Sequence, residues 1–169
     1  MGVRNMVKCA LFAALLCICS WLALPLGGVT FTLQTFGVFL TLGLLGGKWG
    51  SICVAVYLLL GAVGLPVFSG FQGGFGVLLG ANGGFLWGFL LAGLTYWLVK
   101  AVCKKQLLAF LAGLASCYLA GTVWFCCVYA PGTGLWQSVL LCVVPYLVPD
   151  GVKLLLAWVL VKRLEKYLA

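Results

Sequence analysis

Long apolar runs constrain the fold of this chain more than any other feature of its sequence. Short breaks of glycine, proline or basic residues separate the runs, and of the 169 residues 65% are hydrophobic and only 7% are charged. A soluble domain cannot cover its surface with so few polar groups. A helix needs about 20 apolar residues to cross a bilayer, so the length allows six crossings with short loops. The composition therefore predicts an all-α integral membrane protein, with residues 1–169 forming one transmembrane domain.

The positions of the breaks predict where each crossing begins and ends. The expected spans are residues 6–26, 36–46, 49–63, 83–102, 107–129 and 150–164, with a short amphipathic helix at 135–144. Arg4 and Lys8 precede the first run as they would in a signal peptide. Because that run continues past any plausible cleavage point, we expect a retained first span.

The basic residues predict the orientation in the membrane. Nine of the ten lie at one set of span ends: Arg4, Lys8, Lys48, Lys100, Lys104, Lys105, Lys162, Arg163 and Lys166. Positively charged span ends face the cytoplasm, so both termini are expected there, in a multi-pass protein of the inner or plasma membrane. Topology thus explains the net charge of +8, and nucleic acid is not expected as a partner.

Three segments on the opposite side gather most of the remaining polar side chains. They are residues 25–35, the glycine-rich stretch 64–82, and 130–149. Non-helical backbone at membrane depth is tolerated only where it is buried in protein or lines a cavity. Glycine also lets backbone N–H groups approach an anion closely. These segments are therefore expected to fold over an outward-facing pocket for a small polar or anionic ligand.

Asp150 and Lys153 are the leading candidates for ligand contacts. Asp150 is one of only two acidic residues, and Lys153 follows on the same face of a helix that starts near Pro149. A charge in the bilayer costs about 2.5–3.5 kcal/mol, so a pair kept there indicates a functional site. Asp150 can accept hydrogen bonds from ligand N–H groups, and Lys153 can donate to a carbonyl or a carboxylate. The alternative is a structural ion pair near the external interface.

Two amide side chains and one small-residue stripe are further candidates. Asn82 offers a donor and an acceptor where the span at 83–102 begins, although asparagine there is also a common helix N-cap. Gln34 can contact a ligand or staple a loop, and we favour the staple. Ala10 and Ala14 lie four residues apart and can dock another helix or pack internally.

Signals for catalysis and for metal binding are missing from the sequence. There is no histidine, and the nine cysteines show no C-x-x-C spacing. No phosphate-binding loop with the G-x-x-x-x-G-K-[ST] spacing occurs either. We therefore expect no metal, no cofactor bound by this chain and no enzymatic activity.

Several motifs taken together resemble a known family. They are FTLQT at 31–35, GLPVF and GFQGG within 64–74, LG and NGGF within 79–85, and the segment 145–153. In this order and spacing they resemble BioY, the biotin-binding S component of energy-coupling factor (ECF) transporters, over nearly the full length. The resemblance implies a six-helix S-component fold and biotin as the ligand. It also implies a transmembrane coupling subunit and two cytoplasmic ATPases as partners, which would use ATP.

The resemblance also implies roles for particular residues. Asn82, Asp150 and Lys153 would be the polar contacts of the pocket, and Ala10 and Ala14 would dock the coupling subunit. The ureido ring of biotin has two N–H donors and one carbonyl acceptor, so Asp150 with Asn82 can read the N–H edges. Lys153 can serve the ureido oxygen or the carboxylate. Further candidates are the backbone of Gly73 and Gly74 for the other polar end, and Phe75, Trp87 and Tyr146 for the apolar walls.

Two other classes of function stay open at this stage. One is a stand-alone ion-coupled carrier of small molecules with Asp150 as its proton site. The other is a membrane assembly protein in which Asp150 and Lys153 form a purely structural pair.

Overall fold

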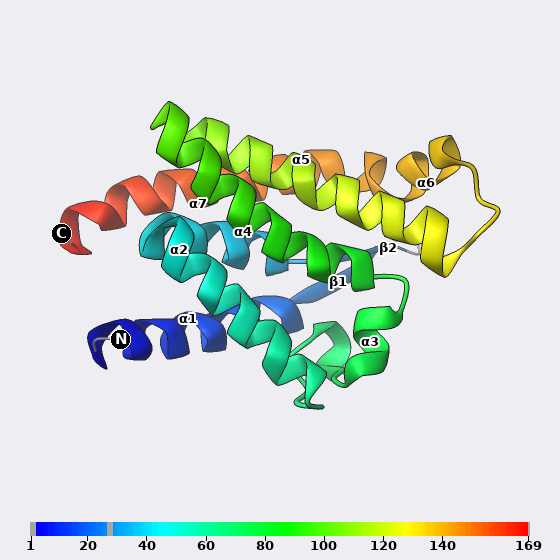
Figure 1. Cartoon of the computed structure of the whole chain (residues 1–169), viewed down its shortest axis with the longest axis horizontal. Helices are drawn as coiled ribbons and strands as arrows, with labels where there is room; N and C mark the ends of the chain where they lie inside the picture. The colour runs from blue at the N-terminus through cyan, green and yellow to red at the C-terminus, as the bar shows by residue number, and fades with distance from the viewer. Residues whose placement is uncertain (1–2, 27–28, 169) are drawn as a thin grey trace.

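A computed structural model describes residues 3–26 and 29–168, and helices make up most of this part of the chain (Figure 1). The long helices are α1 (Val3–Trp21), α2 (Gln34–Ala62), α4 (Gly83–Cys103), α5 (Gln106–Trp124) and α7 (Val144–Leu168). A π-helical segment, Phe125–Tyr129, continues α5. These five helices of the described residues are long and apolar enough to cross a membrane. The nearly all-helical architecture confirms the coarse prediction of the fold class.

The helix α2 contains a sharp turn at Gly46. Its backbone angles there, φ 77° and ψ 167°, are not helical and are essentially restricted to glycine. The chain turns back on itself at this point (Figure 1), and a Cβ added to Gly50 would lie 2.9 Å from the Cα of Leu42. The two arms of α2 correspond to the predicted spans at 36–46 and 49–63. A full crossing needs about 20 residues, and the first arm is shorter than that. The count of six spans therefore stays a prediction.

Replacing Gly46 with alanine is expected to lower the free energy of unfolding by about 1–3 kcal/mol, because an L-residue is strained at these angles. Steric crowding does not contribute, since no described neighbour lies within 4 Å of the added Cβ. Gly134→Ala is the matched control, because Gly134 has equally open surroundings but an ordinary φ of −59°. Unfolding in detergent, followed by tryptophan fluorescence, measures both variants. Equal stability of the two variants would contradict the strain.

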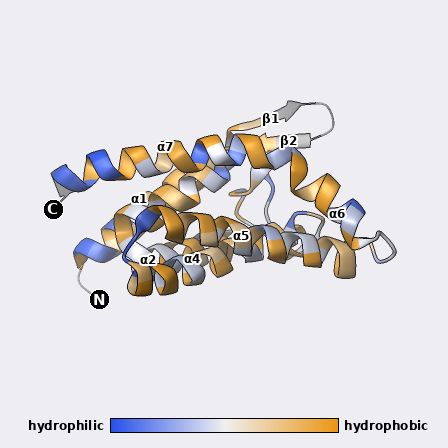
Figure 2. Cartoon of the chain, turned by 90° about the horizontal axis from the view of Figure 1, so that it is seen from above, coloured by the Kyte–Doolittle hydropathy of each residue, from blue (hydrophilic) through white to orange (hydrophobic). Residues whose placement is uncertain are grey.

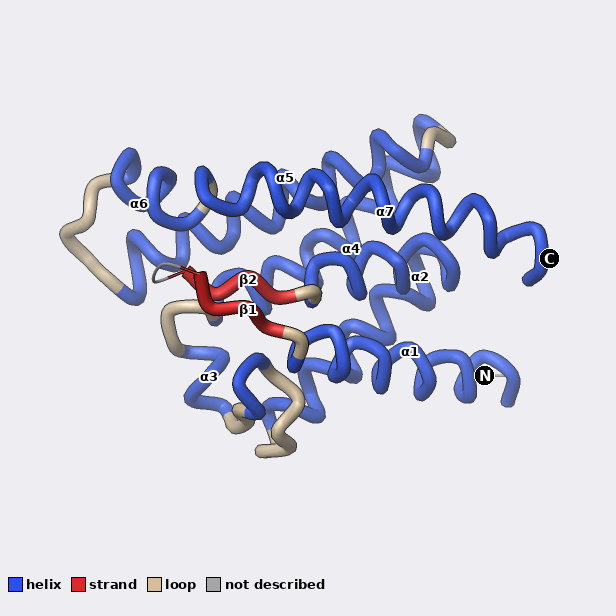
Figure 3. Tube along the Cα trace, turned by 180° about the vertical axis from the view of Figure 1, so that it is seen from behind, coloured by secondary structure: helices blue, strands red, loops and turns tan. Residues whose placement is uncertain are grey.

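A β-hairpin replaces the predicted end of the first span. The helix α1 ends at Trp21, and β1 (Ala23–Leu26) pairs antiparallel with β2 (Val29–Thr32). Extending the span to Leu26 was therefore wrong. Proline at position 25 lacks the N–H that a helix needs, and β-branched residues at 29, 30 and 32 favour a strand. The hairpin lies at the end of the molecule opposite the two termini (Figure 3).

The glycine-rich segment between α2 and α4 is structured. It contains a 3-10 turn (Ser69–Phe71) and the short helix α3 (Phe75–Leu79). The indole N–H of Trp21 donates to the Pro66 carbonyl at 2.8 Å, and the Trp21 ring stacks on Phe71 with centroids 5.0 Å apart. These contacts tie the segment to the end of α1.

The last long helix starts earlier than the sequence predicts. After α6 (Leu135–Cys142), α7 begins at Val144 and contains Pro149 in its interior, whereas the expected span began at Asp150. Pro149 has no N–H to donate to the carbonyl four residues earlier, yet the helix continues through it. Asp150 consequently lies well inside α7.

The core lies where the long helices meet, and apolar side chains also cover the outside. Among the largest fully buried side chains are Phe39, Tyr57, Phe68, Tyr96 and Phe110. Many large apolar side chains are exposed, among them Leu119, Trp136 and Leu156. Hydrophobic residues colour most of the helices in Figure 2, and hydrophilic ones occur near the C-terminal end of α7. An apolar exterior of this kind is what a lipid environment requires.

Candidate functional site

A cavity of about 450 Å³ opens among the ends of the helices. The three segments that were expected to fold over a pocket each contribute to its lining, through Thr32, through Ser69 and Gln72, and through Cys142 and Tyr146. The hairpin, α3 and α6 all lie at this end of the molecule, away from the termini (Figures 1 and 3). The described residues thus form a pocket at one end of a helical bundle.

Asp150 and Lys153 form a buried ion pair on the cavity wall. Lys153 Nζ donates to Asp150 Oδ1 at 2.8 Å, and the two residues are only 9% and 4% exposed respectively. The hydroxyl of Tyr118, on α5, donates to the other carboxylate oxygen, Oδ2, at 2.9 Å. A carboxylate offers about four acceptor positions, so Asp150 keeps capacity for ligand N–H groups. Among the lining residues that the structure describes, Asp150 and Lys153 carry the only charges, so this part of the wall has a strong local dipole but no net charge.

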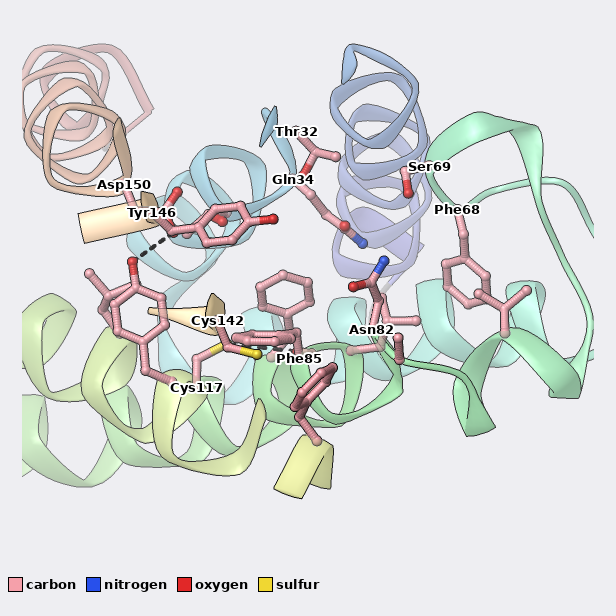
Figure 4. A pocket seen from close by; sticks show the side chains of 18 of the residues that line it. Thr32, Gln34, Phe68, Ser69, Asn82, Phe85, Cys117, Cys142, Tyr146 and Asp150 are labelled. Atoms are coloured by element: carbon pink, nitrogen blue, oxygen red, sulfur yellow. Dashed lines mark hydrogen bonds between the residues drawn. The ribbon is translucent and has the colours of Figure 1, made fainter. Parts of the chain in front are cut away.

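Asn82 occupies the N-cap position of α4, but its side chain points toward the cavity and does not cap the helix. Its backbone carbonyl accepts hydrogen bonds from the N–H groups of Phe85 and Leu86 at 3.1 and 3.2 Å. Its side-chain amide makes no capping hydrogen bond, and it lies among the lining residues in Figure 4. The N-cap alternative is therefore excluded for this side chain.

Gln34 lines the cavity and also staples two parts of the chain. Its Nε2 donates to Tyr57 Oη at 2.8 Å, and the Tyr57 hydroxyl donates to the Val67 carbonyl at 3.1 Å. Gln34 is the first residue of α2 and is buried. The favoured interpretation as a staple agrees with these bonds, and the position also leaves Gln34 at the cavity wall.

The cavity has polar groups on two sides and apolar rings between them. In Figure 4, Asp150 lies on one side, Gln34, Ser69 and Asn82 lie on the other, and Phe85 lies between. Phe89, Leu86 and Leu114 add apolar wall. Such a lining suits an elongated ligand with an apolar middle and a polar group at each end.

Of the further site residues predicted from the resemblance, Tyr146 lines the cavity and the other four lie outside it. The Tyr146 ring packs against Phe31 of β2 with centroids 5.3 Å apart. Gly73 borders a second, more open hollow, the N–H of Gly74 donates to the Gly61 carbonyl at 2.7 Å, and Phe75 is 57% exposed. The structure therefore does not bring residues 73–75 to the main cavity. Trp87 is not among the lining residues either, and its indole N–H donates to the Leu78 carbonyl at 3.3 Å.

Sequence reasoning missed several lining residues within the apolar spans. Phe85 and Phe89 lie four residues apart on α4, and Leu114 and Tyr118 have the same spacing on α5. The apolar members carry no signal that separates them from lipid-facing positions. Tyr118 does carry one, because a hydroxyl inside a membrane span needs a hydrogen-bond partner.

Comparison with known proteins identifies the family. The BioY family model matches residues 1–169, the whole chain. The chain belongs to the BioY family. Among its BioY relatives, the biotin transporter of Thermotoga maritima is 39% identical over 169 residues, which cover 97% of each chain. The probable biotin transporter BioY of Pyrococcus horikoshii is 36% identical over 165 residues, which cover 98% of each chain.

A solved structure resembles this BioY chain in fold. The crystal structure of the S-component for biotin from an ECF-type ABC transporter superposes with a TM-score of 0.86 at 28% identity. The match covers 97% of this chain and 92% of that chain. The predicted resemblance to BioY is thus confirmed, together with its S-component architecture.

Ala10 and Ala14, the predicted docking stripe of this BioY chain, both lie exposed on α1. The buried side of α1 carries Cys9, Ala13 and Leu16. Internal packing therefore does not explain the two alanines, and their face of the helix is open to another partner or to lipid.

Proposed function

We propose that this chain binds biotin with high affinity and is the substrate-capture S component of an ECF-type transporter. The observation that carries the proposal is the cavity whose wall holds the Asp150–Lys153 pair and the Tyr118 hydroxyl. The relatives that match the chain over nearly its whole length are named biotin transporters. The chain itself is a transporter subunit and not an enzyme.

The chemistry of the cavity suits biotin at both ends of the molecule. Asp150 can accept from the ureido N–H groups, and Asn82 can donate or accept. Lys153 can serve the ureido oxygen or the valerate carboxylate. Charge-assisted hydrogen bonds contribute about 1.5–3 kcal/mol each. Burying about four methylenes at ~0.8 kcal/mol each against Phe85 and Phe89 adds to these bonds, so tight binding is expected.

The proposed arrangement has six membrane passes with both termini in the cytoplasm. The hairpin, α3 and α6 all contribute to the cavity lining and lie at the end opposite the termini (Figure 1), so the cavity would face outward and capture biotin there. The face of α1 with Ala10 and Ala14 would dock a transmembrane coupling subunit, which joins two cytoplasmic ATPases. ATP used by those subunits, and by no group of this chain, would drive reorientation and release inside.

Uptake in proteoliposomes tests this proposal against the ion-coupled carrier. The chain is reconstituted with the coupling subunit and the ATPases, and accumulation of radiolabelled biotin is compared with that of the chain alone under an imposed proton gradient. We expect ATP-dependent uptake that falls at least about tenfold, or ~1.4 kcal/mol in barrier, when the ATPases are inactive. Undiminished uptake without them, driven by the proton gradient, would favour the carrier with Asp150 as its proton site.

A further inference from the structure

The hydroxyl of Tyr118 is placed to control the direction of the Asp150 carboxylate. Lys153 lies on α7 three residues after Asp150 and engages Oδ1. Tyr118 comes from a different helix, α5, and engages Oδ2. The carboxylate is therefore held from two helices, by one charged donor and one neutral donor.

A single contact from the same helix does not fix a carboxylate. The terminal torsion of aspartate is broad, so an ion pair to Oδ1 alone leaves the second oxygen free to swing. The donor on α5 removes this freedom and adds no charge. The two remaining acceptor positions then have a defined direction.

The backbone that carries Tyr118 is itself closely packed. The neighbouring Cys117 is 4% exposed, and a Cβ added to Gly88 of α4 would lie 2.9 Å from the Cys117 carbonyl oxygen. The Cys117 thiol also contacts the Phe85 carbonyl at 3.7 Å. Because α4 and α5 approach so closely here, the tyrosine is presented from a rigid surface rather than from a loop.

We propose that Tyr118 is a positioning residue that sets selectivity for a ligand edge that presents an N–H donor, such as one edge of a cyclic urea. It does so by aiming the free acceptor positions of Asp150 into the cavity. The inference rests on the proposed function, which supplies biotin as the probe. The proposal assigns Tyr118 to one end of the ligand: Tyr118 affects binding of the ureido ring and leaves binding of the carboxylate tail unchanged.

Calorimetric titration of Tyr118→Phe tests the proposal with two probes, biotin and biotin methyl ester. The dissociation constants of both are expected to rise by the same factor, about tenfold, because both probes keep the ureido ring. Tyr96→Phe is the matched control, since this buried tyrosine lies outside the cavity and its oxygen accepts from Lys100 at 3.1 Å. It should leave both constants unchanged. A selective loss for biotin alone would place Tyr118 at the carboxylate end and overturn the proposal.

A double-mutant cycle shows whether Tyr118 acts through Asp150. In an Asp150→Asn background, adding Tyr118→Phe should change the biotin dissociation constant less than about twofold, whereas its effect should multiply fully with that of Asn82→Ala. Lowered thermal stability with unchanged affinity would reduce Tyr118 to a structural role. Wild-type affinity of Tyr118→Phe would overturn the inference and leave the proposed function standing. Absence of biotin binding by the wild type would remove both.

Discussion

Asp150→Asn is expected to weaken biotin binding by about 100-fold and to lower the free energy of unfolding by about 3–5 kcal/mol. The affinity falls because a neutral amide offers one oxygen in place of a charged acceptor, and hydrogen bonds to charged groups contribute about 1.5–3 kcal/mol each. The stability falls because the ammonium of Lys153, only 9% exposed, loses its partner, and an uncompensated buried charge is strongly destabilising. Calorimetry and unfolding in detergent measure the two effects separately.

The double variant Asp150→Asn/Lys153→Met separates the ligand site from a structural ion pair. Removing both charges relieves the unpaired ammonium, so most of the lost stability should return. Biotin affinity should stay low, because the acceptor is still missing. If folded Asp150→Asn bound biotin within about threefold of wild type, the pair would be purely structural and the site assignment would be wrong.

Ala14→Trp is expected to reduce biotin uptake in the reconstituted transporter by at least about tenfold while binding stays unchanged. Ala14 lies exposed on α1, outside the cavity. A close helix–helix contact at a small residue leaves no room for an indole, and overpacking of such a contact costs about 1–3 kcal/mol. Uptake by proteoliposomes and co-purification with the coupling subunit give the two readouts.

The control for Ala14→Trp is the same substitution on another lipid-facing surface. Ala115 of α5 is also exposed, so Ala115→Trp adds equal bulk away from the proposed contact and should leave uptake unchanged. Equal uptake by the two variants would show that α1 does not dock through Ala14. A loss of biotin binding in Ala14→Trp would point instead to a distorted bundle.

The helices could be predicted from sequence because lipid imposes simple rules on them. The expected span at 83–102 agrees with α4 to within one residue at its end, since glycine and lysine residues bound an apolar run there. The hairpin at 23–32 was missed because four-residue strands interrupt an apolar sequence without changing its hydropathy. The early start of α7 was missed because Pro149 indicates a helix break, whereas the helix begins at Val144 and continues through this proline.

Part of the site could also be predicted from the sequence. Asp150, Lys153 and Asn82 stand out because polar groups are rare in this sequence, and the structure brings all three to one cavity. Gly73 and Gly74 were also predicted to contact the ligand, but they do not line the main cavity. A Cβ on Gly73 would collide with the Leu65 carbonyl, so tight packing of the loop explains that glycine. Tyr118 escaped notice because its partner on α7 is set by tertiary packing, which no local pattern encodes.

Titration of the purified wild-type chain with biotin in detergent tests the central claim most directly. The change in intrinsic tryptophan fluorescence or the heat of binding is measured, and dethiobiotin is run beside biotin as the comparison ligand. The account predicts saturable binding of one biotin per chain with high affinity. A well-folded chain that binds no biotin would contradict the account, and the cavity around Asp150 would then belong to another ligand.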